Sequence, residues 1–121
     1  MGAEVIVNGR AAPAVAEAAA KIVAAVPGAK VHQAVSDLGT AEGCALAVAE
    51  TEGRLGPIDV LVVNHGIGSA HERLVWEQDP AVWRETMRIN LDGPFELARL
   101  AVGGMCKRGF GRLVFTRSAA G

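Results

Sequence analysis

Short apolar segments that alternate with segments of helical period set the narrowest limit on the fold of this chain. The run 58–63, Ile-Asp-Val-Leu-Val-Val, is almost continuously apolar, as is expected of a parallel strand covered on both faces. Strands are expected at residues 4–8, 30–35, 58–63 and 112–116, and helices at 14–26, 40–54 and 80–107. Strands separated by helices indicate an α/β fold with a parallel sheet and right-handed crossovers.

Capping residues indicate where the expected helices begin. Thr40 can cap the second helix, and Glu42 then lies favourably in its first turn. Asp79 and Pro80 suit the N-cap and the first helical position of the third helix. That helix is expected to continue to about Lys107.

The composition limits the class of protein. The chain has 121 residues, half of them hydrophobic, and a formal net charge of −1, which is typical of one ordinary domain or part of one, here residues 1–121. Its mixed charges form no basic patch for nucleic acid, and no apolar run approaches the ~20 residues of a membrane span. Cys44 and Cys106 lack metal-ligand spacing, so no metal site is expected and both are predicted to be buried. With no signal segment at the start, a cytoplasmic location is expected.

Ser118 follows the last apolar strand, in the run Gly-Arg-Leu-Val-Phe-Thr-Arg-Ser-Ala-Ala-Gly of residues 111–121. Ligands of open α/β sheets bind at the carboxyl ends of the strands, so this serine is a candidate catalytic residue. A serine among small residues is also typical of a simple turn. The two interpretations stay open on this segment alone.

Asn90 interrupts the apolar face predicted for the long helix. That face consists of Trp83, Met87, Asn90, Pro94, Ala98, Ala101 and Met105, which follow one another at steps of three or four. A buried carboxamide needs partners, and Pro94 cannot donate to the carbonyl of Asn90. The Asn90 carbonyl is therefore predicted to hold a water or ligand at a bend; the alternative is a helix irregularity with the side chain satisfied by neighbouring backbone.

Three segments together resemble the short-chain dehydrogenase/reductase family, of its classical type. Residues 58–66 resemble its fourth strand and the following turn, 87–95 the helix with its catalytic Asn, and 111–121 its fifth strand with the catalytic Ser. The resemblance implies that Asn64 and Gly66 lie against the cofactor. It also implies that Ser118 bonds the substrate carbonyl and that the Asn90 carbonyl anchors a water of a proton relay.

The resemblance implies a nicotinamide cofactor as well. In the family, an acidic residue closing the second strand selects NAD, whereas a basic residue at the next position favours NADP by pairing with its 2′-phosphate. Gly9 stands at the first position and Arg10 at the second, so NADP is expected, with NAD as the alternative. Asp37 and Leu38 resemble the pair that borders the adenine, where the Asp caps the amino group. A plain turn before Thr40 accounts for these two residues almost as well.

Two family motifs are not found in these 121 residues: the glycine-rich loop that receives the pyrophosphate, and the Tyr-x-x-x-Lys pair that supplies the general acid. We therefore expect an incomplete Rossmann-type, doubly wound NAD(P)-binding domain that lacks the family's first strand and everything after its fifth, and that is inactive alone. When complete, it would be an oxidoreductase of alcohols or carbonyls and a homo-oligomer. The alternative is a non-catalytic remnant or an interaction module that docks through the helix 80–107.

The family's strand order places the missing first strand between the strands expected at 4–8 and 58–63. We predict that these two strands close the gap and pair directly, because the crossover between them has enough loop to shift by one ~4.8 Å strand spacing. Stability is expected to be marginal, since Val60 and Val62 would lose cover from the helix that follows the lost strand.

Overall fold

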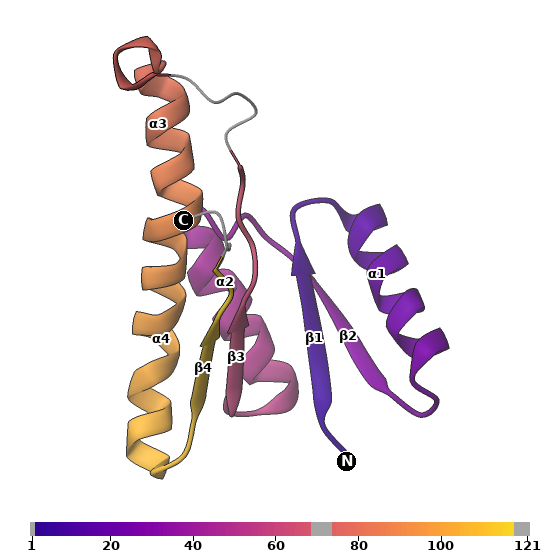
Figure 1. Ribbon diagram of the computed structural model, residues 1–121. Coiled ribbons are helices and arrows are strands. Elements are labelled where there is room, and N and C mark those ends of the chain that lie inside the picture. The colour runs from indigo at the N-terminus through magenta and orange to yellow at the C-terminus, as the bar shows by residue number, and fades with distance from the viewer. Residues whose placement is uncertain (1, 69–73, 118–121) are drawn as a thin grey trace.

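The computed structural model describes residues 2–68 and 74–117 (Figure 1). Its elements are β1 (Glu4–Gly9), α1 (Ala12–Ala25), β2 (Lys30–Val35), α2 (Ala41–Leu55), β3 (Val60–Val63), a 3-10 turn η1 (Val75–Glu77), α3 (Pro80–Met87), a π turn η2 (Arg88–Asp92), α4 (Gly93–Arg108) and β4 (Arg112–Phe115). The alternation of strands and helices confirms the α/β class, and β2 has the predicted bounds.

The strands form two separate parallel pairs. β1 pairs with β2 from Glu4 opposite Lys30 to Gly9 opposite Val35, and β3 pairs with β4 from Val60 opposite Arg112. Within the described residues β1 and β3 share no ladder, so the predicted closure of the gap is wrong.

The packing of the crossover explains why the two pairs stay apart. A Cβ at Gly43, near the start of α2, would overlap the Asp37 carbonyl oxygen, and one at Gly93, at the start of α4, would overlap that of Leu38. The loop after β2 is therefore held between two helix starts, and α2 also packs along α4. A shift of this crossover by one strand spacing would break both contacts.

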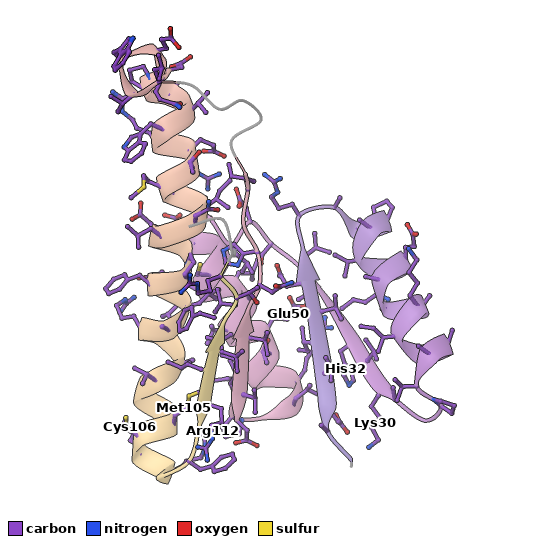
Figure 2. All side chains as sticks on the ribbon, viewed as in Figure 1. Lys30, His32, Glu50, Met105, Cys106 and Arg112 are labelled. Carbon is purple, nitrogen blue, oxygen red and sulfur yellow. The ribbon has the colours of Figure 1, made fainter. Side chains whose placement is uncertain are left out.

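The central core joins α2, β3 and α4. It consists of Cys44, Val48, Val63 and Leu97, and Leu38 and Leu61 pack against it. Cys44 is completely buried, as predicted, but Cys106 is exposed, so the prediction for that cysteine is wrong. Figure 2 shows Cys106 on the outer side of α4, whereas Met105 lies on the side that faces β4.

The long helix is irregular close to the predicted bend, but it differs from its prediction in the face it buries. It begins as expected, with Asp79 Oδ1 accepting from the Ala81 N–H at 2.7 Å, but a π turn at residues 88–92 interrupts it. Its most buried residues are Ile89, Gly93, Leu97, Ala101 and Met105. Trp83 is 59% exposed because α3 extends beyond the strands (Figure 1). The predicted face is therefore right only in its C-terminal part.

The inner strands leave apolar side chains uncovered. Val60 and Val62 of β3 are 53% and 59% exposed, which confirms the predicted loss of cover. Marginal stability stays a prediction. Among the residues that the structure describes, no helix is both long and apolar enough to cross a membrane.

Candidate functional site

A cavity of about 260 Å³ lies where the carboxyl ends of β1, β2 and β3 meet. Its lining residues are Asn8, Gly9, Arg10, Ser36, Asp37, Leu38, Gly39, Asn64, His65, Gly66, Ile67 and Ile89. All of the predicted cofactor residues, Arg10, Asp37, Leu38, Asn64 and Gly66, are in this set. The parallel topology brings them together because the carboxyl ends of parallel strands meet at one edge.

The β1 side of the cavity is polar and tied to β2. The Asn8 amide donates to Ser36 Oγ at 2.7 Å, and the Ser36 N–H donates to the Gly9 carbonyl at 3.1 Å. Within the described residues, the buried Asn8 Oδ1 has no hydrogen-bond partner. The Asn8 side chain is thus held against β2, and the exposed Arg10 follows it at the rim.

Asp37 is held by two groups at the end of β2. Its Oδ1 accepts from the Gly39 N–H at 3.0 Å, and its Oδ2 accepts from Arg88 Nη1 at 3.3 Å. The Gly39 amide, and then the Arg88 guanidinium, keep the pKa of this carboxyl below its ordinary value. Asp37 is thus an ionised, oriented acceptor beside the cavity.

Asn90 is an exposed residue, so the prediction of a buried carboxamide is wrong. Its Nδ2 donates to the Ile67 carbonyl at 2.7 Å, and its Oδ1 accepts from the Ile67 N–H at 2.8 Å. The structure agrees with the alternative interpretation. The helix is irregular at the π turn, and backbone groups of Ile67 satisfy the Asn90 side chain. Asn90 therefore secures the segment after β3, and a Cβ at Gly66 would lie 3.2 Å from its Oδ1.

Ser118 lies outside the described residues, so its proposed catalytic place stays a prediction. Arg88 and the close approach of Gly93 to Leu38 both shape the loop 37–39, and neither was predicted from the sequence. The Arg88 contact spans 51 residues, and no local pattern indicates it.

His65 is a partly buried imidazole among the residues that line the cavity. Its Nε2 is buried without a hydrogen-bond partner in the described part of the chain. Burial lowers the pKa of His65, and a backbone hydrogen bond at Ile89 and the charge of Asp37 oppose this only in part. The neutral imidazole is thus the form that the fold favours.

We expect this histidine to make the fold less stable in acid. Because the pKa of His65 is lower in the folded than in the unfolded chain, the free energy of unfolding should fall as the pH drops below about 6.5, and the loss should level off below the folded pKa. Denaturant unfolding at pH 7.5 and 5.5 checks this by comparison with His65→Asn. An equal pH dependence in both proteins would contradict it.

The geometry defines an α/β protein in which the carboxyl ends of three parallel strands line one cavity, with an exposed arginine and an ordered carboxylate among the lining residues. The model of the short chain dehydrogenase family matches residues 1–121, and the chain belongs to this family.

Individual relatives agree with this assignment. Galactitol 2-dehydrogenase (L-tagatose-forming) of Cereibacter sphaeroides is 37% identical over 120 residues, which are 99% of this chain and 44% of that protein. Acetoacetyl-CoA reductase of Rhizobium meliloti (strain 1021) is 35% identical over 85 residues, covering 70% of this chain and 34% of that protein. The chain therefore spans less than half the length of these relatives.

Solved structures share the arrangement of strands and helices over nearly all of this chain. L-sorbose reductase from Gluconobacter frateurii, complexed with NADPH and L-sorbose, superposes with a TM-score of 0.85 at 27% identity over 96% of this chain and 43% of that one. Gluconate 5-dehydrogenase from Burkholderia cenocepacia J2315, in complex with NADP and tartrate, gives a TM-score of 0.80 at 32% identity over 94% of this chain and 43% of that one. The Rossmann-like fold is thus shown.

Proposed function

We propose that this chain forms the cofactor-binding part of an NADP(H)-dependent oxidoreductase that interconverts a small alcohol and its carbonyl compound. The observation that carries the proposal is the gathering of Arg10, Asp37, Leu38, Asn64 and Gly66 around one cavity. When bound, the nicotinamide supplies or accepts the hydride. NAD is the alternative cofactor.

The residues of the cavity fit a dinucleotide with an adenine and a phosphorylated ribose. Arg10 at the rim would pair with the 2′-phosphate, and Asp37 would accept from the adenine amino group with the Leu38 amide near the ring. Bound NADPH and NADP in the L-sorbose reductase and gluconate 5-dehydrogenase structures support this choice of cofactor.

Two further roles belong to the proposal. Ser118 would donate a hydrogen bond to the substrate carbonyl, and the Asn90 backbone carbonyl would hold a water of the proton relay. The side chain of Asn90 is already committed to Ile67, which leaves its backbone as the group available for that role. A cytoplasmic location also stays a prediction.

Calorimetric titration with NADPH and NADH tests the proposal on the protein expressed from its complete reading frame. We expect saturable binding with NADPH the tighter ligand, and NADPH oxidation with members of a carbonyl panel that includes keto sugars and acetoacetyl-CoA. Absence of binding by either dinucleotide would refute it. The 121-residue chain alone is expected to give no turnover, and turnover that disappears in Ser118→Ala would contradict that expectation.

A stripe of exposed apolar residues supports the proposed homo-oligomer. Leu91, Phe95 and Val102 are 54%, 66% and 39% exposed and follow one another at helical spacing along the outer side of the helix. The same stripe is what the alternative, a docking module, would use. Both assignments require that this face be covered by protein.

We expect Phe95→Glu to convert an oligomer of the complete protein into a monomer, because a charge on the covered face costs desolvation without a partner. Sedimentation velocity measures the change. Leu46→Glu, at a 55% exposed position on α2, is the matched control and should leave the oligomer intact. A monomeric parent protein, or an oligomer that tolerates Phe95→Glu, would contradict the assignment of this face.

A further inference from the structure

Arg88 connects the π turn of the long helix to the loop that follows β2. Its Nη1 donates to Asp37 Oδ2 at 3.3 Å across 51 residues of sequence. Its Nε and Nη2 donate to the two carboxylate oxygens of Glu85, at 2.8 and 2.7 Å. The guanidinium is therefore fixed on its own helix by Glu85 and presents one remaining nitrogen to Asp37.

The surroundings are shaped for this guanidinium. A Cβ at Gly39 would overlap Arg88 Nη1 and lie 2.9 Å from its Cζ, so the glycine leaves the space that the guanidinium occupies. The Arg88 and Asp37 side chains are 30% and 38% exposed, which places their contact at the rim of the cavity. An ion pair in this position is worth little for stability, so its geometry is its more important property.

The contacts leave each oxygen of the Asp37 carboxylate able to accept a further donor. Each carboxylate oxygen has about two acceptor sites, and Oδ1 and Oδ2 each use one, for Gly39 and Arg88. The two contacts, on different oxygens, fix the rotation of the carboxylate about its own axis. Without Arg88 only the Gly39 contact would remain, and Oδ2 would lose its fixed direction.

We propose that Arg88 is a positioning residue, which orients the Asp37 carboxylate to accept a hydrogen bond from the exocyclic amino group of an adenine base. The inference rests on the proposed dinucleotide function and adds a specificity element to it. It places part of the base recognition on the long helix, outside the strand ends that line the rest of the cavity.

The test compares NADPH with its hypoxanthine analogue, in which an oxo group replaces the 6-amino group, by calorimetric titration of the protein from its complete reading frame. The parent protein should prefer NADPH by about tenfold, the value of one hydrogen bond to a charged group. Arg88→Met should reduce the preference to less than about threefold, and Arg88→Lys should restore part of it. Both ligands carry the 2′-phosphate, so the change in charge cancels in the ratio.

Arg99→Met is the matched control, because Arg99 makes the same bidentate pair with the residue three positions earlier, Glu96, on the same long helix. It should keep the full preference for NADPH. In an Asp37→Asn background, Arg88→Met should change the preference no further, which separates positioning from a general loss of packing. If the Met variant does not fold, Arg88→Gln takes its place with the same expectation.

A measurement without ligand separates the possible failures. Carbon-detected NMR titration should show a higher pKa for the Asp37 carboxyl in Arg88→Met and an unchanged one in Arg99→Met. A parent protein that binds NADPH, with an Arg88→Met variant that retains the preference, overturns the role of Arg88 and leaves the dinucleotide function standing. A parent protein that binds neither dinucleotide overturns both.

Discussion

Gly93→Ala should lower the free energy of unfolding by up to about 2 kcal/mol, because forcing an extra methyl group into a packed interior costs about 1–3 kcal/mol and the helix propensity of alanine offsets about 1 kcal/mol of it. Gly93 is buried at the start of α4, where the added Cβ would overlap the Leu38 carbonyl oxygen and lie 3.2 Å from His65 Nε2. The Leu38 oxygen belongs to backbone that Gly43 also holds, so it cannot move aside cheaply. This cost outweighs the ~1 kcal/mol that alanine gains over glycine in a helix.

Gly103→Ala is the matched control on the same helix. A Cβ at this exposed position has no atom within 4 Å, so only the helix propensity acts and stability should rise by ~0.5–1 kcal/mol. Gly43→Ala and Gly53→Ala form a second pair on α2, for which a Cβ at Gly53 likewise meets nothing within 4 Å. Denaturant unfolding followed by circular dichroism measures all four. Equal effects within a pair would show that the loop 37–39 is not closely packed.

Arg10→Ala should weaken binding of NADPH by ~1.5–3 kcal/mol more than binding of NADH, through loss of a charge-assisted hydrogen bond to the 2′-phosphate. Arg10 lies at the cavity rim, and its charge contributes to the lowered pKa values of the Asp37 and Glu85 carboxyls. Those two carboxylates accept hydrogen bonds from Arg88, whereas Arg10 is exposed.

Calorimetric titration of both dinucleotides measures this selectivity in the protein from its complete reading frame. Lys21→Ala removes a cation of α1 that pairs with Glu17 away from the cavity, and it should leave the ratio of the two affinities unchanged. Equal losses for NADPH and NADH in Arg10→Ala would remove the assignment of Arg10 to the phosphate.

Local sequence signals were sufficient to predict most of the helices and strands, because caps and strand patterns depend on only a few neighbouring residues. The Thr40 hydroxyl accepts from the Gly43 N–H at 3.0 Å, as its sequence position predicts. The π turn is different, since it adds a residue to one turn and changes which side chains share a face. A constant period of 3.6 therefore assigned Ala101 and Met105 correctly to the buried face and failed at Asn90.

The candidate site also contains both residues that were predicted from the sequence and contacts that were not. The resemblance to the family indicated Arg10, Asp37 and Asn64, and the parallel topology explains why they share one cavity, since the residues that follow β1, β2 and β3 lie at one edge. The contacts of Arg88 and Gly93 with the loop after β2 depend on how the long helix crosses that loop. That crossing is set by packing between segments about 50 residues apart, for which one sequence carries no local signal.

Because the four strands form two separate pairs, the cavity lies between two halves of the molecule and is lined by residues from both. The half built on β1 and β2 contributes residues 8–10, the half built on β3 and β4 contributes residues 64–67, and residues 36–39 lie in the crossover that joins the two halves. A ligand that contacts both walls binds only while the halves are adjacent, so by thermodynamic linkage its binding free energy also holds them together. The affinity for the ligand and the stability of the contact between the halves are then thermodynamically coupled. A substitution that loosens this contact therefore weakens ligand binding, even when the substituted residue does not contact the ligand.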